Sequence, residues 1–170
     1  MKHEHNPNDL FKRELTLMTE VETQSDRGCA IIATSWLEEE LKAALKSVLS
    51  GNERAWKKLF SSTAPLANFS SKIELAALIG IIDESTYFDL HAIRKIRNEF
   101  AHEITTADHE ALSFDAPHIR DRCYSLRAIA NESCNTPRKA FVRSCGIINA
   151  NLYLFWFAKP EPISALLSKG

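Results

Sequence analysis

The sequence has little glycine, little net charge and no long uninterrupted apolar run. Glycine occupies five of 170 positions. Because glycine supplies the positive φ angles of tight turns, its scarcity disfavours a turn-rich all-β protein and favours helices. The formal charge is −1, from 21 Lys and Arg against 22 Asp and Glu. A uniformly basic coat for nucleic acid is therefore excluded, and any phosphate contact needs a local cluster of cations.

Neither a membrane segment nor a disulfide framework is expected. The most apolar late stretch, 146–158, contains Asn149 and Asn151 and is shorter than the about 20 residues that span a bilayer. The amino-terminal stretch lacks the apolar core of a secretory signal. The four cysteines form no C-x-x-C pair, so we expect core thiols in a cytoplasmic protein. His3 and His5 lie in a polar tail, and we expect no metal site and no cofactor.

Apolar residues recur every three or four positions along most of the chain, which is the spacing of helices that bury one face. No pair of strands is credible. We therefore expect an all-α protein, a bundle of about six or seven helices forming a single domain over 10–158. A polar tail, 1–9, precedes this domain and a second tail, 159–170, follows it. The expected helices cover 10–23, 26–49, 53–60, 71–82, 84–101, 118–130 and 137–158.

The segment 87–102 carries the most distinctive chemistry. A rotation of about 100° per residue gathers an apolar stripe made of Leu90, Ile93, Ile96 and Phe100. Arg97 falls inside that stripe. Because burying an unpaired charge is costly, Arg97 must meet a carboxylate, reach a groove or face a second subunit.

Arg97, Asn98 and His102 together have the chemistry to handle a phosphodiester. The arginine fork matches phosphate oxygens, the amide orients a reacting group, and the histidine moves a proton near neutral pH. Arg94 and Lys95 add charge beside Arg97, and these three are the predicted phosphate or nucleic-acid contacts. The alternative is that Arg97 is a salt-bridged core residue and that His102 is stabilised by the end of its helix.

Three further groups of residues have two interpretations each. Arg120, Arg122 and Arg127 either extend a basic patch or form a solvated helix face. The aromatic run 153–157 belongs to the core or to a dimer contact. The acidic run 38–40 is expected on a solvated face, with one carboxylate turned toward a basic groove as the alternative.

The string Arg97-Asn98-Glu-Phe-Ala-His102 resembles the R-N-x-x-x-H signature of HEPN domains, all-helical modules found in ribonuclease toxins and in defence and regulatory proteins. In ribonucleolytic members, two protomers pack so that both Arg/His pairs line one groove. The resemblance implies a homodimeric, metal-independent endoribonuclease that binds RNA. It assigns phosphate contact to Arg97, orientation to Asn98 and proton transfer to His102.

An ordered set of three segments, within roughly 10–130, resembles the mannitol operon repressor-like family. The segments are Asp26-Arg27-Gly-Cys-Ala-Ile-Ile-Ala with the following Trp36-Leu37-Glu38, then Ala64-Pro-Leu-Ala-Asn-Phe-Ser-Ser-Lys72-Ile, then Leu90 through His102. This resemblance implies an all-helical regulator without a helix-turn-helix, assigned to repression of a sugar-utilisation operon. A near-neutral chain argues against direct DNA reading. We therefore favour a regulator that acts through protein partners over the ribonuclease.

Overall fold

The computed structural model describes residues 12, 16, 18–49, 51–102 and 111–163. The described residues form helices and contain no β-strand, so the predicted all-α bundle is confirmed. The tail 1–9, most of the first expected helix and the two tail histidines lie outside these residues, although 18–23 is helical. The elements are α2 (Asp26–Val48), α3 (Glu53–Phe60), α4 (Phe69–Leu78), α5 (Glu84–His102), α6 (Pro117–Tyr124), the 3₁₀ helix η1 (Arg127–Ile129) and α7 (Pro137–Phe157).

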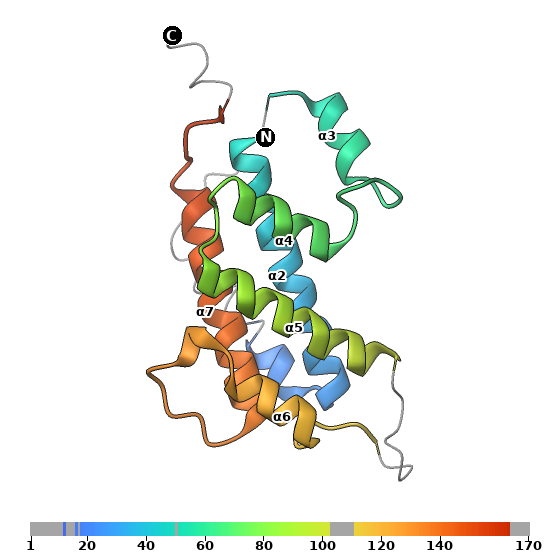
Figure 1. Cartoon of the computed structure of the whole chain (residues 1–170), viewed down its shortest axis with the longest axis vertical. Helices are drawn as coiled ribbons and strands as arrows, with labels where there is room; N and C mark the ends of the chain where they lie inside the picture. The colour runs from blue at the N-terminus through green and yellow to red at the C-terminus, as the bar shows by residue number, and fades with distance from the viewer. Residues whose placement is uncertain (1–11, 13–15, 17, 50, 103–110, 164–170) are drawn as a thin grey trace.

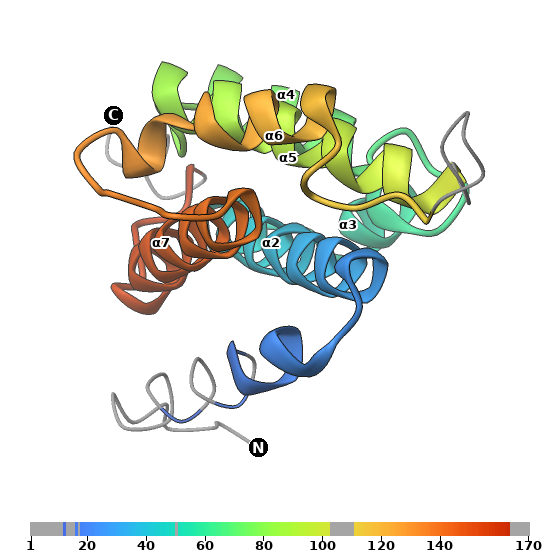
Figure 2. The same cartoon turned by 90° about the horizontal axis from the view of Figure 1, so that it is seen from below.

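The helices pack in two layers, with α2 and α7 side by side and α4, α5 and α6 lying over them (Figures 1 and 2). Hydrogen bonds near both ends of α7 show that it runs parallel to α2. Near the start of both helices, Arg138 Nη1 donates to Asp26 Oδ1 at 2.7 Å. Farther along, Trp156 Nε1 donates to Glu40 Oε2 at 2.7 Å. These two bonds set the register of the pair.

The apolar stripe predicted for the fifth helix is the core face of α5. Its four members, Leu90, Ile93, Ile96 and Phe100, are all fully buried. Phe100 lies against Phe114, with ring centroids 4.9 Å apart, and Phe114 lies 5.1 Å from Phe141 of α7. Aromatic rings at these spacings add to the energy of apolar burial and tie α5 to α7.

The predicted helix 71–82 is shifted in the structure, where α4 covers Phe69–Leu78. Asn68 caps it, because its Oδ1 accepts a hydrogen bond from the Ser71 N–H at 2.8 Å. Gly80 has φ of 76°, a left-handed conformation that favours glycine and ends helices. The prediction was therefore wrong at both ends.

The prediction of a single helix over 118–130 is also wrong. The chain leaves α6 after Tyr124 and starts again as the short helix η1 at Arg127. The backbone N–H groups of Arg127 and Ala128 donate to the Asp89 carboxylate, so they do not continue the backbone hydrogen bonds of α6. A partner 38 positions away in the sequence therefore overrides the local helical pattern.

The acidic run 38–40 is not a solvated face. Glu40 is buried and accepts the Trp156 hydrogen bond. Glu38 Oε1 lies 2.6 Å from the Nζ of Lys72, which is itself buried. Glu39 alone of the three is exposed, and it pairs with Lys42. The Glu38–Lys72 pair joins two of the three segments on which the family resemblance rests.

The cysteines are core thiols, as expected, since Cys29, Cys123 and Cys145 are buried and Cys134 is half-buried. None of the four forms a disulfide. Burial raises the pKa of Cys29 to about 11 and that of Cys123 to about 12, and it raises the pKa of Cys145 well above its ordinary value. These groups are therefore neutral thiols at physiological pH.

The aromatic run at the end of α7 divides between core and surface. Tyr153 is buried and its ring lies 4.8 Å from that of Trp156, whereas Leu154 is 54% exposed. None of the helices within the described ranges combines the length and the apolar character that crossing a bilayer demands.

Replacement of Lys72 tests the buried ion pair. We expect Lys72→Ala to lower the free energy of unfolding by about 3 kcal/mol, because it leaves the Glu38 carboxylate without its partner in a largely dry position. Lys42→Ala breaks the exposed pair with Glu39 and serves as the control, with an expected loss of about 0.5 kcal/mol or less. Urea denaturation followed by circular dichroism measures both. Equal losses in the two variants would show that the Glu38–Lys72 pair lies in a solvated position.

Candidate functional site

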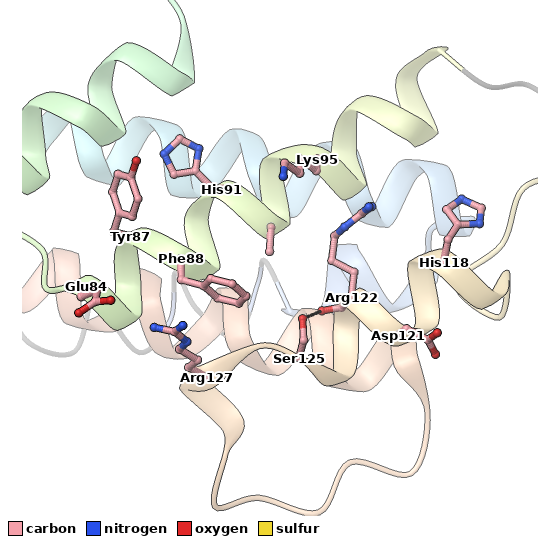
Figure 3. A pocket seen from close by; sticks show the side chains of 11 residues that line it. Glu84, Tyr87, Phe88, His91, Lys95, His118, Asp121, Arg122, Ser125 and Arg127 are labelled. Atoms are coloured by element: carbon pink, nitrogen blue, oxygen red, sulfur yellow. Dashed lines mark hydrogen bonds between the residues drawn. The ribbon is translucent and has the colours of Figure 1, made fainter.

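A groove of about 640 Å³ lies between α5 and the segment formed by α6 and η1. Figure 3 shows side chains from both walls entering it. The contributing side chains of α5 are Glu84, Tyr87, Phe88, His91, Ala92 and Lys95, and those of the facing wall are His118, Asp121, Arg122, Ser125 and Arg127. The volume is within the range of small-molecule binding sites.

A buried carboxylate, Asp89, holds the start of η1 in place at one end of the groove. Asp89 is 1% exposed, and each of its oxygens accepts one backbone hydrogen bond at 2.8 Å, from the N–H of Arg127 and of Ala128. Burial raises the pKa of Asp89, while these two hydrogen bonds act in the opposite direction. The carboxylate thereby fixes the start of η1 against α5 and places the Arg127 side chain at the groove.

Arg127 and Phe88 form a stacked pair at this end. The guanidinium carbon of Arg127 lies 4.1 Å from the centroid of the Phe88 ring. Phe88 is 38% exposed, so the ring offers an apolar surface to the groove while it also supports the cation.

The opposite end of the groove is closed by an ionic cluster across α5 and α6. Glu99 of α5 accepts a hydrogen bond from Arg122 Nη1. Its second oxygen lies 3.1 Å from Nε2 of His118. One carboxylate thus contacts two groups of α6, and the hydrogen bond from Arg122 ties the two walls together.

A second polar cluster borders the groove on the side of α4. The Glu74 carboxylate lies 3.2 Å from both the Tyr87 hydroxyl and Nε2 of His91. Burial lowers the pKa of His91, and the Glu74 charge opposes that shift. His91 also lies edge-on to the Tyr87 ring, with centroids 4.5 Å apart. These contacts hold the two α5 side chains in fixed orientations.

The predicted catalytic residues lie farther along α5 and do not line this groove. Arg97 and Asn98 are half-buried, and His102 is exposed as the last residue of the helix. No carboxylate of the described chain is within ion-pair distance of Arg97. Five positions of an α-helix separate Arg97 from His102 by about 140° of rotation. Their phosphate-handling role stays a prediction.

Of the predicted phosphate contacts, Lys95 lines the groove, whereas Arg94 and Arg97 do not. Arg94 is half-buried, and its Nε makes no hydrogen bond to the part of the chain that the structure describes. Arg122 and Arg127 line the groove, whereas Arg120 does not, so the basic patch of all three arginines stays a prediction. The structure therefore brings Lys95 together with Arg122 and Arg127.

The sequence analysis missed the aromatic and histidine members of the groove. A signal was available for Phe88, because this large apolar residue lies outside the stripe that α5 buries. No comparable signal marked His118, whose relation to Glu99 depends on how α6 packs. Across the described ranges, no three His, Cys, Asp or Glu side chains are grouped so that they could hold a metal ion.

The Asp89→Ala variant tests how the groove is built. We expect a loss of about 3 kcal/mol in the free energy of unfolding, because two buried N–H groups lose their acceptor. The control is Asp83→Ala, which removes an exposed carboxylate that accepts the Thr86 N–H at 2.8 Å and should cost about 1 kcal/mol. Urea titrations of both variants provide the comparison. A loss for Asp89→Ala no larger than that of the control would contradict this role.

The fold is similar to that of a chain in a solved structure described as the X-ray structure of the MtlR-HPr complex from Escherichia coli. The TM-score is 0.69 and the sequence identity is 16%, and the match covers 82% of this chain and 97% of that chain. At this identity the likeness shows the fold alone, and it confirms the expected similarity to a mannitol operon repressor at that level. No protein-family model and no curated protein sequence matches the chain.

Proposed function

We propose that the protein is a transcriptional regulator of the mannitol operon repressor type that acts by binding a protein partner. The observation that carries this proposal is the fold likeness, which extends over 97% of the matched chain from the MtlR-HPr complex. The partner proposed for this chain is accordingly HPr or a protein of the same kind. The family resemblance of three sequence segments supports the same function.

The charge of the chain favours a protein partner over direct reading of DNA. Proteins that bind DNA alone neutralise several phosphates and carry a basic face. This chain has a formal charge of −1. Several of its basic side chains are also committed to internal pairs, since Lys72, Arg122 and Arg138 bind Glu38, Glu99 and Asp26. Repression would then depend on a complex with another protein.

The arrangement of α5 favours binding over catalysis. Because Arg97 and His102 lie on different sides of one helix, a single copy does not present them to one phosphate. A ribonuclease would need a second copy to bring the pairs together. We also propose that the chain forms the predicted homodimer. The number of copies in the free protein then decides whether the Arg97/His102 pairs of two copies can meet.

Titration of the full chain with HPr from the same organism tests the proposal. We expect saturable heat of binding, with the two proteins eluting together in size-exclusion chromatography. Light scattering of the free chain and of the complex gives the number of copies in each. The absence of binding to HPr at concentrations where the matched control, the MtlR-HPr pair of Escherichia coli, associates would contradict the proposal.

The same preparation distinguishes a regulator from a ribonuclease. In EDTA, a structured RNA and a single-stranded RNA should both remain intact, and the His102→Ala variant should bind HPr as the parent does. If the parent cleaves RNA and His102→Ala does not, with an unchanged melting temperature, the regulator hypothesis is wrong. The protein is then a metal-independent endoribonuclease. Cleavage that persists in the variant would identify a contaminating nuclease.

A further inference from the structure

The groove between α5 and α6 contains two cations, Lys95 and Arg127, that form no ion pair with a carboxylate of the described residues. Lys95 is exposed and makes no ion pair within that part of the chain. Arg127 lies on the Phe88 ring, and the nearby Asp89 carboxylate binds backbone N–H groups rather than its guanidinium. Two positive groups from facing walls therefore remain available to an anion.

In Figure 3 a third cation, Arg122, lies on the side of Lys95 that faces away from Arg127. Figure 3 shows it extending from α6 toward α5, on the same side as Lys95 and His118. It shares the Glu99 carboxylate with His118. Arg122 is therefore already paired with Glu99, and Lys95 and Arg127 are the cations that remain for an anion.

The acidic residues of the groove leave its centre open. Asp121 lines the groove, but its side chain is 75% exposed and lies 3.6 Å from the Nε of Arg120, which does not line the groove. Glu84 belongs to the first turn of α5 and lies at the end near Tyr87 in Figure 3. In Figure 3, Lys95, Arg122, Ser125 and the Phe88 ring lie between these two acidic residues.

We infer that this groove binds a small organic phosphate, with the phosphate group between the cations and an apolar or planar body against Phe88. Arginine forks match the oxygens of a phosphate and hold it with directed hydrogen bonds, and several cations favour a dianion over a single carboxylate. A cavity of about 640 Å³ holds a molecule of this class. The inference goes beyond the proposed function and does not depend on the protein partner.

Isothermal titration with phenyl phosphate and with inorganic phosphate tests the inference. We expect saturable binding of phenyl phosphate, tighter than that of inorganic phosphate because of the contact with Phe88. Lys95→Ala and Arg127→Ala should each lower the affinity for phenyl phosphate about tenfold, because each removes a charge-assisted contact. Phe88→Leu should weaken the binding of phenyl phosphate more than that of inorganic phosphate.

The control is Lys58→Ala, which removes an exposed cation of α3 and should bind phenyl phosphate as the parent does. Circular dichroism and melting temperature verify the fold of each variant, and Lys95 is exposed, so its replacement is expected to be tolerated. Unchanged affinity in Lys95→Ala and Arg127→Ala, or no saturable binding, would overturn the inference. The inference would also be overturned if a single-stranded RNA bound more tightly than phenyl phosphate and its binding depended on Lys95 and Arg127. The groove would then bind the phosphates of a nucleic acid.

Discussion

The parallel pairing of α2 with α7 is the constraint on which the rest of this structure depends. Apolar side chains fill the contact, and the bonds from Arg138 to Asp26 and from Trp156 to Glu40 fix its register. Arg138 also donates to the carbonyl oxygens of Val21 and Gln24, so it ties the preceding residues to the same end. The upper layer of α4, α5 and α6 rests on this pair, because the buried stripe of α5 needs a surface to cover it.

That dependence explains which parts of the fold could be predicted from the sequence. The stripe of α5 repeats every three or four residues, so its burial follows from local periodicity. The break between α6 and η1 does not, because it results from Asp89, 38 positions before Arg127. The half-buried position of Glu38 and the buried position of Glu40 likewise depend on Lys72 and Trp156 of other helices. Hydrophobic periodicity does not predict which single side chains form hydrogen bonds between helices of the bundle.

The same distinction applies to the candidate site. The sequence placed the polar chemistry on α5 and predicted Lys95 as a phosphate contact, and Lys95 lines the groove. It grouped Lys95 with Arg97, however, because neighbours in sequence were treated as neighbours in space. The structure separates them: Lys95 lines the groove with residues of α6 and η1, while Arg97 is half-buried nearer the end of α5. Packing of a second element, rather than proximity along one helix, creates the groove.

α5 thus has two polar regions, a groove shared with α6 and a carboxyl-terminal end that carries the R-N-x-x-x-H string. Our account assigns anion binding to the groove. Two-dimensional ¹H–¹⁵N spectra of the labelled chain, recorded during addition of phenyl phosphate, test this assignment most directly. We predict that the amide resonances of Phe88, Lys95 and Arg127 move progressively while those of Arg97 and His102 stay in place. Shifts centred on Arg97 and His102, with the groove resonances unchanged, would contradict the account.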